Sequence, residues 1–141
     1  MKTTQMLLEE LKTTENIKTY LKNNKSEFYQ DDPVEMLHMM LDKSERTMAE
    51  VVKESDVGDY AYKVFSQKRK ASRNVLISLA LTMKSDYEEV QKLLLASGYA
   101  ALTPYVKRDS IILFSLFKGK TVIETDEILD KERLETISRE K

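Results

Sequence analysis

The hydrophobic positions at the start of the chain recur at the spacing of an amphipathic α-helix. Between residues 4 and 23 the apolar side chains fall on one helical face, and lysines dominate the other side (apolar: Leu7, Leu8, Leu11, Ile17, Tyr20 and Leu21). We therefore expect a single helix over 4–23. Such a helix either folds back on the core or pairs with a second copy, and the pattern leaves both readings open.

A second apolar period follows a polar link and predicts the first core helix. Asp31 or Asp32 precedes Pro33, and an acidic N-cap before a proline is a typical helix start. The apolar positions over 33–43 then repeat with a helical period (Met36, Leu37, Met40 and Leu41). His38 lies between them, and we expect a partly exposed helix residue rather than a catalytic base.

The helical spacing of apolar residues stops near residue 55 and resumes near residue 60. This pattern predicts two short helices joined by a tight turn. Ser44 or Thr47 begins a helix over 45–54, and the residues Ser-Asp-Val-Gly at 55–58 interrupt it. A second short helix is expected to begin at Tyr60, with Asp59 as its N-cap.

Two more helices complete a five-helix unit. Ser72 is the expected N-cap of the most apolar helix, which we place at the centre of the core (Val75, Leu76, Leu79, Ala80, Leu81 and Met83). Asp86 and Glu89 have the spacing of a capping box, and Gly98 ends the helix that they begin.

The remaining residues predict two C-terminal helices. The first, over 107–118, is apolar nearly all round and ends at Gly119, and the second begins at Thr125 or Asp126. They provide either extra core or a homodimer interface, and we favour the interface. The expected organisation is a helical extension (1–32), a five-helix unit (33–97) and a C-terminal extension (98–141).

Composition supports an all-α protein and argues against several functions. Only three glycines and two prolines occur in 141 residues, too few for the turns of a sheet-rich fold. The chain has no cysteine, one histidine, no glycine-rich phosphate loop and no nucleophile motif. We therefore expect a cytoplasmic protein that is not an enzyme and holds no metal or cofactor.

Charge is distributed unevenly along the chain. Residues 60–97 carry a net charge of +4 and residues 98–120 carry +3, whereas 33–59 carry −4 and 121–141 carry −3. A basic middle between acidic ends is compatible with an anionic partner such as DNA, and equally with an ordinary solvated surface.

Two short helices and a basic corner have the sequence form of a helix-turn-helix. In that motif the second helix, here about 59–67, enters the major groove. Tyr60, Lys63 and Gln67 would face the bases, while Tyr62 and Phe65 would face the core. The basic residues that follow would contact phosphates (Lys68, Arg69, Lys70 and Arg73).

The five helices and the segment Gln67-Lys68-Arg69-Lys70-Ala71-Ser72 resemble the phage-repressor-like helix-turn-helix family, of the lambda repressor and Cro type. Three positions depart from the family pattern, because Asp56 and Gln67 replace glycines and Ala71 replaces proline. The resemblance implies a five-helix repressor-like bundle that binds double-stranded DNA as a homodimer and regulates transcription. The alternative is a fold of this type that has lost DNA binding and acts as a protein–protein interaction module.

Overall fold

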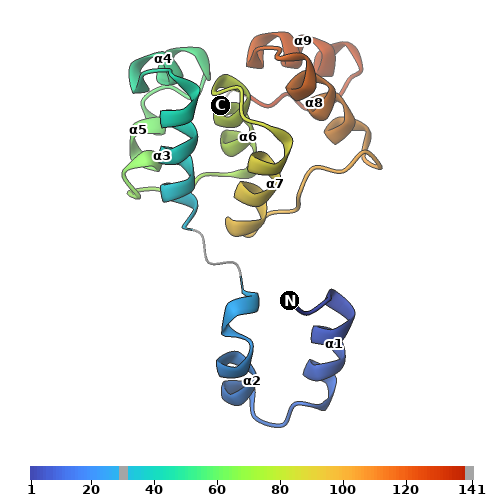
Figure 1. Ribbon diagram of the computed structural model, residues 1–141. Coiled ribbons are helices and arrows are strands. Elements are labelled where there is room, and N and C mark those ends of the chain that lie inside the picture. The colour runs from blue at the N-terminus through green and yellow to red at the C-terminus, as the bar shows by residue number, and fades with distance from the viewer. Residues whose placement is uncertain (29–31, 139–141) are drawn as a thin grey trace. The chain divides into compact units, whose positions relative to one another are not determined.

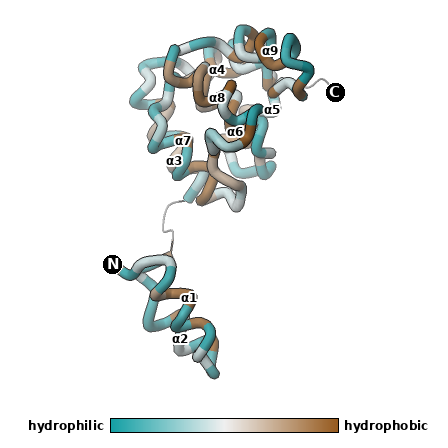
Figure 2. Tube along the Cα trace, turned by 90° about the vertical axis from the view of Figure 1, so that its right-hand side faces the viewer, coloured by the Kyte–Doolittle hydropathy of each residue, from teal (hydrophilic) through white to brown (hydrophobic). Residues whose placement is uncertain are grey.

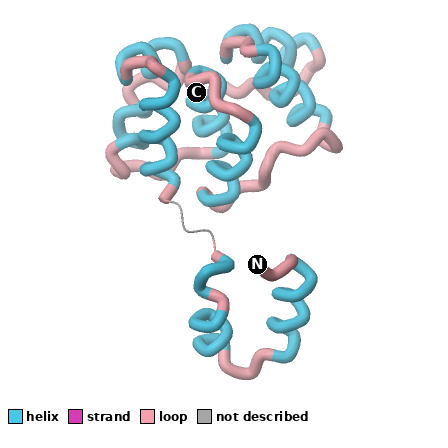
Figure 3. Tube along the Cα trace, in the orientation of Figure 1, coloured by secondary structure: helices cyan, strands magenta, loops and turns pink. Residues whose placement is uncertain are grey.

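The computed structural model describes residues 1–28 and 32–138, and within these ranges every regular element is a helix (Figures 1 and 3). The α-helices are α1 (Thr4–Thr13), α2 (Ile17–Asn23), α3 (Pro33–Ser44), α4 (Met48–Glu54), α5 (Tyr60–Phe65), α6 (Arg73–Thr82), α7 (Tyr87–Ala96), α8 (Lys107–Lys118) and α9 (Val122–Lys131). A short 3₁₀ turn, η1 (Lys25–Glu27), follows α2. The expected all-α class is confirmed, and no helix in the described ranges has the length and apolarity needed to cross a membrane.

The chain divides into two compact units, Met1–Asp31 and Asp32–Lys141. We call the first the N-terminal hairpin, because α1 and α2 run side by side and are joined by a short turn (Figure 1). We call the second the helical body. It contains α3 to α9, including all five helices that the sequence predicts between residues 33 and 97.

The single helix expected over 4–23 is wrong, because the chain breaks at residues 14–16. Thr14 has an extended backbone and ends α1. The side chain of Asn16 then accepts hydrogen bonds from the backbone N–H groups of Lys18 and Thr19, so it caps α2. Asparagine hydrogen-bonds the backbone readily in this way, and here that local bond ends the helical period.

Most of the predicted helix starts in the helical body are confirmed by their caps. Four N-cap side chains accept a hydrogen bond from the first turn of their helix (Asp32 of α3, Thr47 of α4, Ser72 of α6 and Asp86 of α7). Asp59 is the exception, since its side chain accepts no such bond at the start of α5. Asp31, the other candidate for the first of these caps, lies outside the described residues.

Helix α6 forms the centre of the core, as its apolar sequence predicts. Every residue from Leu76 to Thr82 is buried, and α6 packs against α4, α7 and α9. The core around it takes side chains from every other helix of the body (for example Leu37, Val51, Val64, Leu93, Ile112 and Leu129). The segments 33–97 and 98–141 therefore share one core.

The last helix begins earlier than the sequence analysis places it. Thr121 and Glu124 form a complete capping box, so α9 starts at Val122 and the expected start at Thr125 or Asp126 is wrong. The carboxylate of Asp126 instead accepts backbone hydrogen bonds from Ile137 and Ser138. By contrast α8 has the predicted bounds, and Gly119 ends it with a φ of 68°.

Candidate nucleic-acid interface

The connection between α4 and α5 is a tight turn that depends on two left-handed residues. Asp56 has a φ of 61° and Gly58 has a φ of 74°. Asp56 is one of the positions at which the resembled family has glycine, and aspartate is among the few other residues that adopt this conformation without a large penalty. Within the turn, the backbone N–H of Val57 donates to the hydroxyl of the buried Ser55. The turn therefore forms with aspartate instead of glycine at position 56.

Helix α5 is fixed to the body by one face and leaves the other in solvent. Ala61, Val64 and Phe65 are buried in the core. The backbone oxygen of Phe65 also lies 2.8 Å from Nε2 of His38, whose ring packs edge-on against the Phe65 ring. His38 is exposed, as expected, and it joins α3 to the last turn of α5.

The exposed face of α5 agrees only in part with the one that the sequence analysis chose, because Lys63 is exposed as expected but the two tyrosines are not placed as expected. Tyr62, expected in the core, is 47% exposed, so that expectation is wrong. Tyr60, expected in the groove, is half-buried, and its hydroxyl donates to the backbone oxygen of Lys70. The solvent-facing stripe runs along Tyr62, Lys63 and Ser66, because Ser66 lies about one turn beyond both Tyr62 and Lys63.

Gln67 lies beyond the end of the helix, because α5 ends at Phe65 rather than near 67. Gln67 has a φ of 67°, a left-handed conformation that glycine adopts more readily than other residues. Its side-chain amide donates to Asp32 over 3.4 Å. The next backbone N–H groups, those of Lys68 and Arg69, turn back to donate to the Lys63 oxygen. The basic residues therefore begin directly beside the exposed stripe.

Three cations at this surface form no ion pair with any residue that the structure describes. They are Lys63, Lys68 and Arg69, and all three are exposed. Lys70 is also exposed, and its ammonium lies 5.4 Å from the centre of the Tyr99 ring. We call Tyr62, Lys63, Ser66, Lys68, Arg69 and Lys70 the basic face.

Arg73 belongs to the interior of the body rather than to this face. Its guanidinium forms a salt bridge with Asp109, which is 5% exposed, and donates to the backbone oxygens of Ala100 and Ala101. The second carboxylate contact of the guanidinium is 3.4 Å long. The expected phosphate ligand is therefore a tie between α6, the loop after α7 and α8.

The carboxylate of Asp109 pairs with Arg73 and not with its sequence neighbours Lys107 and Arg108. Lys107 pairs with Glu132, and Arg108 donates to Asn74 and to the backbone oxygens of residues 135 and 136. These contacts cross between elements far apart in sequence. No helical periodicity could have identified them.

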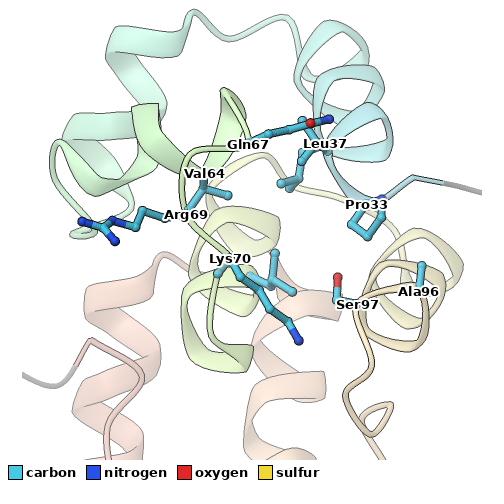
Figure 4. A pocket seen from close by; sticks show the side chains of 11 residues that line it. Pro33, Leu37, Val64, Gln67, Arg69, Lys70, Ala96 and Ser97 are labelled. Carbon is cyan, nitrogen blue, oxygen red and sulfur yellow. The ribbon is translucent and has the colours of Figure 1, made fainter.

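A cavity of about 380 Å³ lies behind the basic face, between the start of α3, the end of α7 and residues 67–71 (Figure 4). Its inner lining is apolar and includes Leu37, Val64 and Leu76. Figure 4 shows the Arg69 guanidinium turned away from the other labelled side chains. Arg69 therefore presents its charge outward rather than to the cavity.

Comparison with known proteins identified no relative: no protein-family model, curated protein or solved structure matches the chain.

Proposed function

We propose that this chain is a sequence-specific DNA-binding regulator of the phage-repressor-like helix-turn-helix type, acting as a homodimer on double-stranded DNA. The observation that supports this most directly is the basic face. It joins the exposed stripe of a short helix to cations that form no ion pair within residues 1–28 and 32–138.

The arrangement of the basic face suits two kinds of DNA contact, one to base edges and one to phosphates. Lys63 and Tyr62, on α5, would reach base edges, where a lysine recognises guanine and a tyrosine contacts a thymine methyl or a phosphate. Lys68 and Arg69, on the following segment, would bind phosphates and fix the register without reading sequence. At the margin, the Tyr60 hydroxyl donates to the Lys70 backbone oxygen, while the side chains of Lys70 and Gln67 tie the segment to Tyr99 and Asp32.

Binding also needs a rigid platform, because every group that is ordered on binding reduces affinity. Here α5 is anchored by buried side chains, by His38 and by the two backbone hydrogen bonds to the Lys63 oxygen. The groove-facing residues would therefore be positioned before DNA arrives.

The test is fluorescence anisotropy of the full chain against a pool of random duplexes at low and moderate salt, followed by selection of bound sequences. We expect salt-dependent binding, with the slope of log K against log salt changing by about 0.9 for each phosphate contact. The variant Lys68→Glu/Arg69→Glu should lose binding.

The matched control is Lys92→Glu/Lys131→Glu, which makes the same charge change at exposed lysines of α7 and α9. It should lower affinity only slightly, because it removes long-range attraction but no contact. Absence of binding at low salt, or equal losses in both variants, would contradict the proposal.

A second function, a protein-interaction module, is favoured by an aromatic patch on the body. Phe117 is 66% exposed, and its ring lies 6.0 Å from the exposed Tyr87 ring. Phe114, one turn earlier, is also exposed. Phe114→Ser/Phe117→Ser would abolish such an interaction and leave DNA affinity unchanged, so the two functions can be separated.

A further inference from the structure

The N-terminal hairpin exposes nearly all of its apolar side chains. Tyr20 and Asn24 are its only fully buried residues among those that the structure describes, and α1 buries none. Large apolar side chains remain in solvent along both helices and just after them (Met6, Leu8, Leu11, Ile17, Leu21 and Phe28). Figure 2 marks hydrophobic positions of the hairpin in brown. Leu8 and Leu11 share a face of α1, and Ile17 and Leu21 share a face of α2.

A polar cluster, rather than an apolar core, holds the hairpin together. The ammonium of Lys2 donates to Glu10 over 2.8 Å and to the amide oxygen of Asn24 over 2.5 Å. The Asn24 amide nitrogen donates in turn to Glu10 and to the backbone oxygen of Tyr20. This cluster sets the relative positions of α1 and α2 while their apolar faces stay uncovered.

Such a unit is too small to be stable by itself. Below about 40 residues, chains generally need disulfides, a metal or an oligomeric partner to stay folded. The hairpin unit ends at Asp31, and the chain has no cysteine. No group of metal-ligating side chains occurs in the ranges 1–28 and 32–138. The apolar faces of the hairpin therefore need a further protein surface to cover them.

The charges of the two helices point to a second copy of the same hairpin. α2 carries Lys18 and Lys22 and no acidic residue, and no ion pair involves either lysine within the described part of the chain. Exposed acids lie on α1 and in the turn after it, at Glu9 and Glu15, and Glu9 also forms an exposed ion pair of 3.7 Å with Lys12 of its own helix. Placing α1 of one copy beside α2 of another brings these opposite charges together twice, once on each side of a two-fold axis.

We propose that two chains pair through their N-terminal hairpins, which form a four-helix bundle with Leu8, Leu11, Ile17 and Leu21 in its interior. The geometry is that of other antiparallel bundles, in which each hairpin contributes one apolar face. This inference rests on the hairpin alone and does not depend on DNA binding. It places the dimer contact in the hairpin instead of in the two C-terminal helices, α8 and α9, where the sequence analysis favoured it.

The test is sedimentation equilibrium of the full chain over a range of concentrations. We expect a monomer–dimer equilibrium for the natural sequence, and a dissociation constant raised by at least about tenfold in Leu8→Glu/Leu21→Glu. The matched control, Phe114→Glu/Phe117→Glu, changes the exposed aromatic patch of the body by the same charge and should remain dimeric.

A second set of variants, in which charges are exchanged, keeps the test valid if Leu8→Glu/Leu21→Glu fails to fold. Lys18→Glu/Lys22→Glu changes only exposed positions and should weaken the dimer, while adding Glu9→Lys/Glu15→Lys should restore it. A monomeric natural chain, a dimer unaffected by the hairpin variants, or a dimer lost only in the aromatic control would each overturn the proposal. A monomer would also indicate that the hairpin covers its apolar face on its own chain or on a different protein.

Discussion

Replacing Arg73 by methionine separates the role that the sequence suggests from the role that the structure gives it. As a phosphate ligand, Arg73 would contribute to DNA affinity and little to folding. In the structure its guanidinium neutralises the buried Asp109 carboxylate and satisfies two backbone oxygens of the 98–106 loop. The variant keeps a long apolar stem of similar size but leaves Asp109 with the backbone N–H of Thr103 as its remaining donor.

The expected loss follows from the burial of the pair. Breaking a buried ion pair from one side destabilises a protein by about 3–5 kcal/mol. The side chain of Asp109 is 7% exposed and that of Arg73 is 24% exposed, so water reaches the arginine side and favours the low end, about 3 kcal/mol. At about 4 °C for each kcal/mol in a domain of this size, the melting temperature should fall by about 12 °C.

The assay is urea and thermal unfolding of the full chain, followed by circular dichroism at 222 nm. Asp109→Asn is the control, because an amide can still accept from Thr103, and it should lose about 1–2 kcal/mol. In the double variant the losses should not add, since the two residues are in direct contact. The structural role is refuted by two results together. The free energy of unfolding of Arg73→Met would lie within about 0.5 kcal/mol of that of the natural chain, and the slope of log K against log salt for DNA binding would fall by about 0.9, the value of one phosphate contact.

Three further changes test local features. Asp56→Gly should raise the free energy of unfolding by about 0.5 kcal/mol, because glycine relieves the left-handed backbone but also makes the unfolded chain more flexible; a loss in urea unfolding would show that the carboxylate itself stabilises the turn. Thr47→Ala removes half of a capping box and should cost about 1 kcal/mol in the same assay, and an unchanged midpoint would contradict the assignment. The hydrogen bond from Lys2, and then that from Asn24, lowers the pKa of Glu10 below its ordinary value of 4.5. The cluster therefore stabilises the hairpin above that pH and loses its contribution as the pH falls through the lowered pKa; NMR shifts of hairpin amides should report this, and Glu10→Gln should abolish it.

The parts of the fold that depend on local chemistry could be predicted from the sequence. Thr47, Ser72 and Asp86 are caps whose partners lie within three residues, so spacing alone identifies them. The break before α2 was missed because the apolar period continues through it. The new helix start is set by the Asn16 side chain, which accepts a hydrogen bond from the backbone N–H of Lys18. The start at Thr121 was missed although its signal, a threonine three residues before a glutamate, was present.

The candidate site was predicted less well, because exposure depends on packing between elements. Tyr62 and Tyr60 were assigned to the wrong faces because a helix of six residues offers too few positions for its apolar period to fix which face is buried. The partner of Arg73 lies 36 residues away, beyond the reach of any periodic pattern. Lys68 and Arg69, which follow the helix, are exposed whichever register it takes.

The link from Arg73 to Asp109 also bears on how this protein could be dissected. A fragment that ends near residue 97 would contain every helix that the family resemblance requires. It would nevertheless leave an arginine without its carboxylate, and it would open the core where Ile112, Val122 and Leu129 now pack. The C-terminal helices thus complete the core of the helical body that carries the basic face. Transferring the basic face to another protein would succeed only if α8 and α9 were transferred with it.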